Sequence, residues 1–368
     1  MTTRTEAGGQ ISPDFLPPQM RKHVDPAAPV PLRMMAAKGL VPLSPVHMLG
    51  ALYMLSTDPD PGVRETAEKS AAGLPERILS AALRDEAVQP PVLGWFLGKL
   101  WDKDAYAELL VLNANTPDEA VAAIASGCSA KVAELISENQ LRLLRHPDIV
   151  RQLVQNPALP GSVIDRTCDF AVRSGVMLED VPQMQAARVR IFGPEEAAKP
   201  HDPGPTAEDV LRDFGPADGP ETGEEPGLNL TQRLMRMSIA EKIKLATLGN
   251  KEARTILLRD SNKLVATAAI RSPRITDGEI LAQANNRAAH EDVLRTVYSN
   301  KEWTKDYQVK LALVKNPKVP VAIVMRFLST LRESDVKDLS RNRNVSSGVQ
   351  TLAKRMMEKK TAPKRGKG

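Results

Sequence analysis

Aromatic residues are scarce in this sequence, at 4% of 368 residues. Alanine, leucine and valine are abundant instead, so we expect an aliphatic core of the kind that packed helices form. Strand signals are also scarce. Alternating runs of β-branched residues are almost absent, and no Asn-Gly or Asp-Gly pair separates two such runs. The sequence therefore predicts an all-α fold.

Cysteine is rare as well, with only Cys128 and Cys168. Two cysteines are too few for a disulfide framework or a zinc site, and we expect both to be small buried hydrophobic residues. The N-terminus lacks a positively charged segment followed by an apolar one, so it does not resemble a signal peptide. No run approaches the ~18 apolar residues that a membrane span needs. We therefore expect a cytoplasmic protein without a transmembrane segment.

Motifs for catalysis and metal binding are also missing. The sequence contains no G-x-x-x-x-G-K-[ST], G-x-G-x-x-G or H-E-x-x-H pattern. The histidines are scattered without the spacing of metal ligands: His23, His47, His146, His201 and His290. We expect neither an enzyme activity nor a cofactor nor a metal.

Charge is distributed unevenly along the chain. Residues 229–368 hold 29 Lys and Arg against 13 Asp and Glu, whereas residues 1–228 hold 21 against 32. Between the two halves, residues 192–228 are rich in proline, glycine and acid, which predicts an extended acidic linker with one short helix after Thr206. The predicted domains are a disordered arm (1–30), an N-terminal helical module (31–191), the linker (192–228), a basic C-terminal helical module (229–360) and a basic tail (361–368).

One turn recurs in both modules, as LVQNPALP at 153–160 and as LVKNPKVP at 313–320. Proline after asparagine stops the first helix, and the asparagine side chain can serve the backbone groups freed there. The last proline suits the start of the next helix, and Leu159 or Val319 before it can pack inward. Weaker copies are LNANTPDEAV (112–121), AIRSPRITDGEI (269–280), VYSNKEWTKD (297–306) and LSRNRNVSSGV (339–349).

Such short helix–turn–helix units cannot bury their apolar faces alone and must stack on their neighbours. The sequence therefore predicts two α-solenoid modules. The stretch DPDPGVRETAEKSAAGLP (58–75) resembles the second half of a HEAT repeat, with Asp60 at the turn followed by Val63, Arg64 and Ala67.

The Asn-Pro turns resemble those of the leucine-rich-repeat variant family, which also forms α-solenoids. Two features depart from that family: the turns are irregularly spaced, and its cysteine cluster is missing. The phrases GNKEARTILLRDSNKLV and SNKEWTKDYQVKLALVKNPK also resemble segments of bacterial proteins of no known activity. These resemblances imply a helical-repeat fold and bring no activity with them.

Basic residues occupy every inter-helix turn of the C-terminal module, whereas the N-terminal turns around Asn115 and Asn156 have Ala, Thr and Gln. The candidate binding residues are Lys251, Arg271, Arg274, Lys301, Lys305, Lys315, Lys318, Arg341 and Arg343. Because equivalent turns of a solenoid align along one edge, we expect these side chains to form a stripe that attracts polyanions. The alternative is that they only solvate the turns and complement helix dipoles.

The leading functional hypothesis is a non-enzymatic scaffold or adaptor that binds a protein partner through its helical-repeat surfaces. The alternative is binding of nucleic acid or another polyanion, with Trp303 and Tyr307 as a stacking platform if they are exposed. A third hypothesis is a HEAT-like alkylpurine DNA glycosylase, for which Asp306 beside Trp303 is the local candidate. An intramolecular contact between the acidic linker and the basic stripe is a further alternative.

Overall fold

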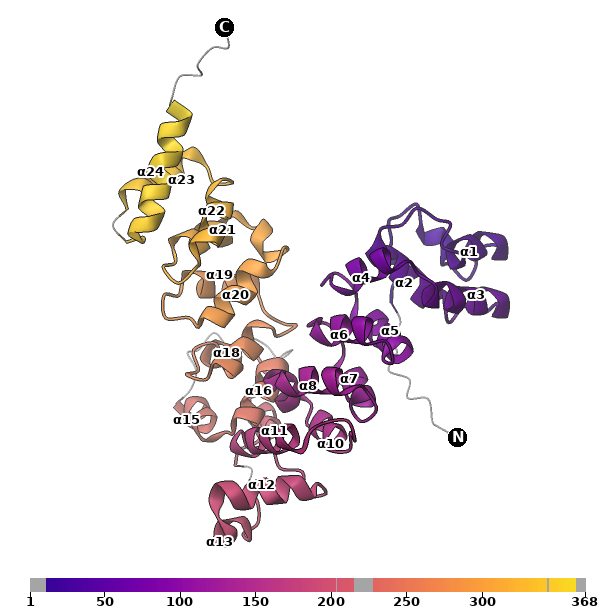
Figure 1. Cartoon of the computed structure of the whole chain (residues 1–368). Coiled ribbons are helices and arrows are strands. Elements are labelled where there is room, and N and C mark those ends of the chain that lie inside the picture. Colours follow the sequence, from indigo (N-terminus) through magenta and orange to yellow (C-terminus); the bar gives the residue numbers. More distant parts are fainter. Residues whose placement is uncertain (1–10, 203, 215–227, 343, 362–368) are drawn as a thin grey trace. The chain divides into compact units, whose positions relative to one another are not determined.

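The computed structural model describes residues 11–202, 204–214, 228–342 and 344–361. Within these ranges the chain forms 24 α-helices and three short 3-10 helices, and no strand (Figure 1). This confirms the prediction of an all-α protein. The chain divides into two compact units at Pro200 and His201, which are described in turn as unit 1 (1–200) and unit 2 (201–368).

Unit 1 begins with two 3-10 helices and continues with thirteen α-helices. Their bounds are η1 Pro13–Phe15, η2 Arg21–His23, α1 Val30–Ala37, α2 Pro45–Leu55, α3 Pro61–Ala72, α4 Glu76–Leu83, α5 Pro90–Leu100, α6 Asp104–Leu112, α7 Asp118–Ala125, α8 Ala130–Glu138, α9 Gln140–Arg145, α10 Asp148–Val154, α11 Gly161–Arg173, α12 Pro182–Phe192 and α13 Pro194–Ala197. Unit 2 holds α14 Ala207–Phe214, α15 Leu228–Arg236, α16 Ile239–Leu248, α17 Lys251–Leu257, α18 Lys263–Ile270, α19 Asp277–Asn285, α20 Glu291–Ser299, η3 Trp303–Lys305, α21 Tyr307–Lys315, α22 Val321–Leu328, α23 Glu333–Arg341 and α24 Ser347–Thr361.

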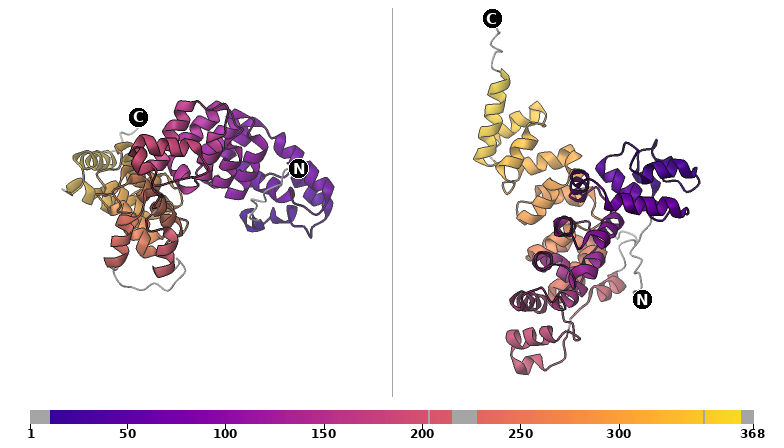
Figure 2. Two further views of the ribbon diagram at one scale, coloured as in Figure 1. Left: turned by 90° about the horizontal axis from the view of Figure 1, so that it is seen from below. Right: turned by 45° about the vertical axis from the view of Figure 1, so that its right-hand side comes forward.

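Alternate helices contact one another along each unit. In unit 1, α2 contacts α4, α4 contacts α6 and α6 contacts α8; in unit 2, α14 contacts α16, α16 contacts α18 and α18 contacts α20. Figures 1 and 2 show the helices of each unit following one another in sequence order. The buried side chains between them are almost all aliphatic, as the shortage of aromatic residues predicts.

Helix starts follow the capping rules. Ser44, Asp60 and Ser129 accept a hydrogen bond from a backbone N–H of the helix that they precede, and proline occupies the first turn of several helices. In the stretch that resembles a HEAT repeat, Asp60 caps α3, and Val63 and Ala67 are fully buried.

The expectation of a disordered arm at 1–30 is wrong for residues 11–29, which are ordered and packed. Ile11, Leu16 and Val24 are buried, although proline and polar residues separate them in the sequence. The Phe15 ring meets the His47 ring edge-to-face, with 5.3 Å between their centroids. The spacing of these buried residues does not follow the period of an α-helix, because the segment forms 3-10 turns. Residues 1–10 lie outside the described ranges.

The predicted linker at 192–228 also differs in part from the structure. The helix expected after Thr206 is present as α14, and Thr206 and Asp209 cap it reciprocally. However, α14 is not an isolated linker helix, because Ala207 and Val210 are buried and the Ala207 N–H donates to Glu241 of α16 at 2.9 Å. Most of the acidic stretch that follows, residues 215–227, lies outside the described ranges, as does the basic tail from residue 362.

The recurring turn is built as its sequence predicts, with one addition. Asn156 and Asn316 follow the ends of α10 and α21, and Leu159 and Val319 are buried. The Oδ1 atom of Asn316 accepts a hydrogen bond from the Lys318 N–H at 3.0 Å, within its own turn.

The side-chain amides of Asn156 and Asn316 each reach an earlier turn of the same unit, which is not the turn directly before their own. Asn316 Nδ2 donates to the carbonyl oxygens of Ala284 and Asn286, at 2.9 and 3.0 Å. Asn156 Nδ2 donates in the same way to Ala125 and Cys128, at 2.8 and 3.0 Å. The last carbonyls of a helix have no partner within that helix. The asparagine therefore satisfies a helix end about 30 residues earlier as well as its own turn.

Asn113, between α6 and α7, repeats this arrangement. Its Nδ2 donates to the carbonyl oxygens of Leu83 and Asp85 at 2.9 and 3.3 Å, and its Oδ1 accepts from the Asn115 N–H at 3.0 Å. All three asparagines are buried, so these bonds are shielded from water.

We predict that Asn316→Ala destabilises the protein by about 1–3 kcal/mol, the cost of leaving a buried acceptor without a partner. The control is Asn285→Ala, because the Asn285 side chain is exposed and bonds only to Leu281 in its own helix. Chemical denaturation of the full chain measures both. Equal stabilities of the two variants would contradict the structural role of the turn asparagine.

We also predict that Gly50→Ala releases the N-terminal segment. A Cβ atom at Gly50 would lie 2.5 Å from Phe15 Cε1, so the ring has to leave its site on α2. Gly98→Ala is the matched control, since no atom lies within 4 Å of its added Cβ and alanine is the better helix former. Tryptic cleavage after Arg21 and Lys22 should be faster only in Gly50→Ala, and unchanged cleavage would refute this packing.

Candidate partner-binding surface of unit 2

The turns of unit 2 fall into two sets, because consecutive turns connect the helices at alternating ends. The first set comprises residues 258–262, 286–290, 316–320 and 342–346. The second set comprises residues 249–250, 271–276, 300–306 and 329–332.

Hydrogen bonds join consecutive members of the first set. His290 bonds through Nε2 to the Asp260 carbonyl at 3.0 Å, and Asn316 reaches Asn286 as described above. Lys318 Nζ donates to the carbonyl oxygen of Ala289 at 2.8 Å. Arg287 Nη2 reaches as far as the Asn344 carbonyl, at 2.7 Å. The first three turns of this set therefore lie side by side, and the fourth lies within reach of the Arg287 side chain.

Side-chain ties also link members of the second set. Arg254 donates to the Gly249 carbonyl and to both carboxylate oxygens of Glu279, which caps α19 together with Thr276. Farther along the unit, the Tyr307 hydroxyl donates to the Asp335 carboxylate and accepts from the Arg332 N–H.

The nine candidate residues are therefore not placed in one row. Five of them flank or belong to turns of the second set: Lys251, Arg271, Arg274, Lys301 and Lys305. Three flank or belong to turns of the first set: Lys315, Lys318 and Arg341. Arg343 lies outside the described residues. The prediction of a single stripe is wrong because it treated every turn as equivalent, whereas only alternate turns of stacked helices share an edge.

Acidic residues accompany the basic residues of the second set. Lys305 donates to Glu302 at 2.6 Å, and Asp277 and Asp306 begin the neighbouring helices. The positive charge of this set is therefore offset locally, and its basic residues make no strong field of one sign.

The segment from Tyr307 to Arg332 is different, since it contains five basic residues and no acidic residue. Its cations make no ion pair with any described residue: Lys310, Lys315, Lys318, Arg326 and Arg332. Lys318 and Arg326 donate instead to backbone carbonyl oxygens, which leaves their positive charge uncompensated.

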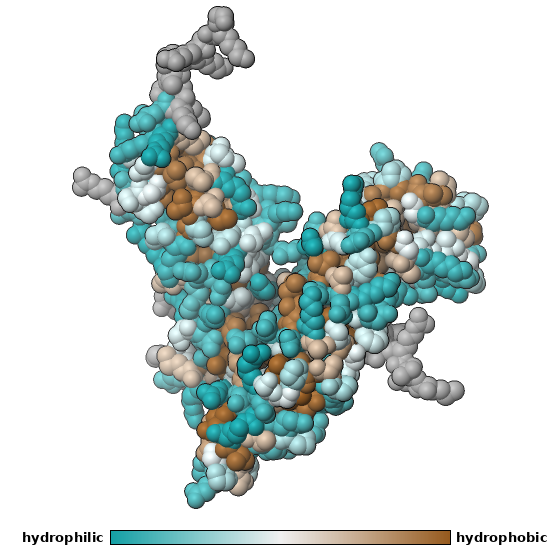
Figure 3. All heavy atoms as spheres, viewed as in Figure 1, coloured by the Kyte–Doolittle hydropathy of each residue, from teal (hydrophilic) through white to brown (hydrophobic). Residues whose placement is uncertain are grey.

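Two apolar side chains lie exposed on α22 within this segment. Val321 and Met325 are 53% and 51% exposed and stand one helical turn apart. In Figure 3, apolar side chains gather on the visible surface of the C-terminal helices of unit 2. We call the exposed group Lys315, Lys318, Val321, Met325 and Arg326 the α22 surface.

The residues proposed for a DNA glycosylase have structural roles. The Asp306 carboxylate caps α21 by accepting the Gln308 N–H at 2.6 Å. Trp303 is half-buried in η3, and the Arg332 guanidinium covers the Tyr307 ring at 4.7 Å from its centroid. The Tyr307 ring therefore has its face covered by Arg332, and the Asp306 carboxylate is engaged at the start of α21.

Both cysteines are buried, as the sequence predicts. Burial raises the pKa of the Cys128 thiol and that of the Cys168 thiol to about 11. Since the thiolate is the reactive form, neither side chain is an activated nucleophile near neutral pH.

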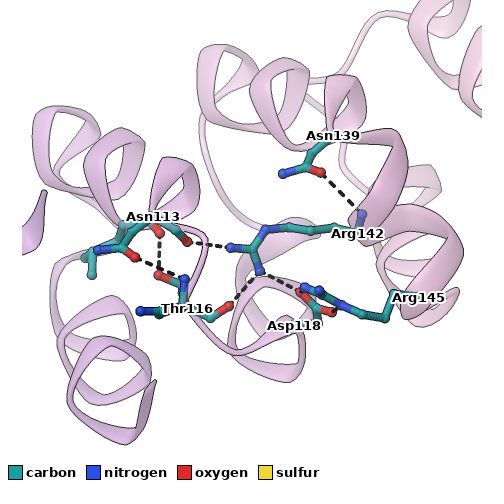
Figure 4. A network of polar contacts seen from close by, with 8 residues as sticks. Asn113, Thr116, Asp118, Asn139, Arg142 and Arg145 are labelled. Atoms are coloured by element: carbon teal, nitrogen blue, oxygen red, sulfur yellow. Dashed lines mark hydrogen bonds and ion pairs between the residues drawn. The ribbon is translucent and has the colours of Figure 1, made fainter. Parts of the chain in front are cut away.

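A buried network of arginines and an aspartate was missed by the sequence analysis (Figure 4). Arg142 donates to Asp118 at 2.5 Å and to the carbonyl oxygens of Thr116 and Asn113, both at 2.6 Å. Arg145 Nη2 donates to the same carboxylate at 2.8 Å. This network fixes α9 against the turn before α7, so it supports the fold and is not exposed to a ligand.

Two further buried pairs have the same function: Arg33 with Asp58, and Arg254 with Glu279. In each pair the partners are about 25 residues apart in the sequence. A sequence pattern could have predicted these buried ion pairs: an arginine and an acidic residue recur about one helix pair apart.

Comparisons with known proteins gave no match: no family model, no curated protein and no solved structure is similar to the chain. Among the helices of the described ranges, none combines the length and the apolar character that crossing a membrane requires. The same ranges hold no group of three or more His, Cys, Asp or Glu side chains arranged for a metal ion.

Proposed function

We propose that the chain is a non-enzymatic scaffold made of two α-solenoids, and that it binds a protein partner through the surface of unit 2. The contacts between alternate helices and the ties between consecutive turns support the solenoid arrangement. Repeat stacks of this kind present extended surfaces on which another protein can lie.

One observation carries the assignment of the binding surface. In the rest of unit 2 acidic residues are interspersed with the basic ones, as where Lys242 faces Asp260 at 2.9 Å and Arg254 faces Glu279 at 3.2 Å. The segment 307–332 leaves its five cations unpaired among the described residues and places two apolar side chains beside them. Lys318 and Arg326 also bond backbone carbonyl oxygens of neighbouring segments, but these neutral partners leave their charge uncompensated, so the surface suits a partner that brings negative charge.

A second candidate function is binding of a polyanion such as nucleic acid. The observation in its favour is the excess of 29 basic over 13 acidic residues in 229–368. Binding of that kind falls steeply as salt rises and depends on the number of cations rather than on apolar contacts.

The test is affinity capture with the tagged full chain from cells that naturally contain it, before and after nuclease treatment. We expect a protein to co-purify in a fixed ratio and to remain bound after nucleic acid is removed. The double variant Lys310→Gln/Lys315→Gln should reduce its recovery several-fold, by loss of charge attraction.

The matched control is Lys301→Gln/Lys305→Gln, which removes two cations from the second turn set and should leave recovery unchanged. Loss of the captured protein after nuclease treatment would favour the polyanion candidate. Equal recovery with both double variants would place the binding surface elsewhere.

A further inference from the structure

The α22 helix carries two exposed apolar side chains in addition to its buried ones. Val324, Phe327 and Leu328 are buried against the neighbouring helices and account for its inner face. Val321 and Met325 adjoin that face on the helix and are about half exposed. The apolar face of α22 thus extends onto the surface, and adjoining exposed apolar side chains are a feature of contact surfaces.

The chemistry around these two side chains identifies what fits them. Lys315 ends α21, Lys318 lies in the turn that leads into α22, and Arg326 follows Met325 directly. The Arg326 guanidinium is held in place, 4.7 Å from the Phe327 ring centroid and 3.1 Å from the Tyr298 carbonyl oxygen. Two aliphatic anchors thus stand within a set of ordered, unpaired cations.

A nucleic acid strand does not match this combination. Bases bind by stacking on exposed aromatic rings, whereas Phe327 is buried and the Tyr307 ring is covered by Arg332. Phosphates would satisfy the cations but would leave Val321 and Met325 in water. A peptide that carries both carboxylates and apolar side chains satisfies the two parts at once.

We infer that the α22 surface binds an acidic peptide segment of a partner protein, with apolar side chains of that segment packed on Val321 and Met325. This inference rests on the proposed scaffold function and specifies its partner. The apolar contact slows dissociation of the complex. The cations disfavour basic partners and raise the association rate.

The test uses fluorescent peptides and the full chain, followed by fluorescence anisotropy. The first probe is a helical peptide of about 18 residues with Glu and Asp on one face and Leu at i, i+4 spacing on the other. The second probe has serine in place of every leucine, so it keeps the charge and loses the apolar face. A single strand of twenty deoxythymidines is the third.

We expect the leucine peptide to bind at least about tenfold tighter than the serine peptide, since burying a leucine or methionine side chain is worth that factor. Met325→Ser should abolish most of this preference. Met235→Ser is the matched control, because Met235 is also exposed but lies on α15. Lys315→Gln should weaken both peptides a few-fold. Unchanged melting temperatures verify that these exposed substitutions leave the fold intact.

Four results would overturn the inference: no peptide binding at all, equal affinity for the two peptides, tighter binding of the deoxythymidine strand, or an unchanged preference in Met325→Ser. The proposed scaffold function is judged separately. If Met325→Ser captures the partner protein as well as the unaltered chain does, the scaffold stands and the inference about its partner fails.

Discussion

The fold depends on how its many helix ends are satisfied. Short helices end often, and every end leaves backbone carbonyl groups without a partner inside the helix. At three turns the buried side chains of Asn113, Asn156 and Asn316 supply those partners, each with an amide that bonds an earlier turn and an oxygen that bonds its own. This side chain ties neighbouring helix pairs together without a long loop or a large aromatic core.

Because the asparagine completes the turn from within, the outward residues of that turn can vary without cost to the fold. The two most similar turns illustrate this, since Gln155 and Ala158 in one correspond to Lys315 and Lys318 in the other. Both turns keep the same hydrogen bonds to the asparagine. Lys315 and Lys318 of the proposed binding surface therefore stand at positions where the same turn also forms with other residues.

Much of the fold could be predicted from local rules. Asn-Pro ends helices at 156 and 316, the Thr206 cap starts α14, and the absence of strand patterns excludes a sheet. What failed depended on contacts between distant residues. Ile11 and Phe15 pack through irregular turns, so their spacing has no period that the sequence could reveal. A buried arginine such as Arg142 cannot be distinguished in the sequence from an arginine on the surface.

The candidate site was predicted only in part, for a geometric reason. The charge distribution predicted that the C-terminal half is the basic one. The comparison of the turns 153–160 and 313–320 indicated Lys315 and Lys318 as candidate binding residues. The sequence order of turns does not reveal which of them share an edge, so residues such as Lys251 and Lys315 were grouped although they belong to different turn sets. The exposed pair Val321 and Met325 was not predicted. In a helix with many apolar residues, the sequence does not show which of them neighbouring helices cover.

Native-state hydrogen exchange tests the role of the turn asparagine most directly. The amides of Ala158 and Lys318 lie in exposed turns but donate to buried asparagine oxygens, at 2.8 and 3.0 Å. The Ala27 amide donates likewise to Asp25 Oδ1 at 2.9 Å, but the Asp25 side chain is exposed. We predict that Ala158 and Lys318 exchange at least about 100-fold more slowly than Ala27, because their turns open only with the surrounding helices. Equal exchange at all three amides would show that the asparagines do not hold the repeats together.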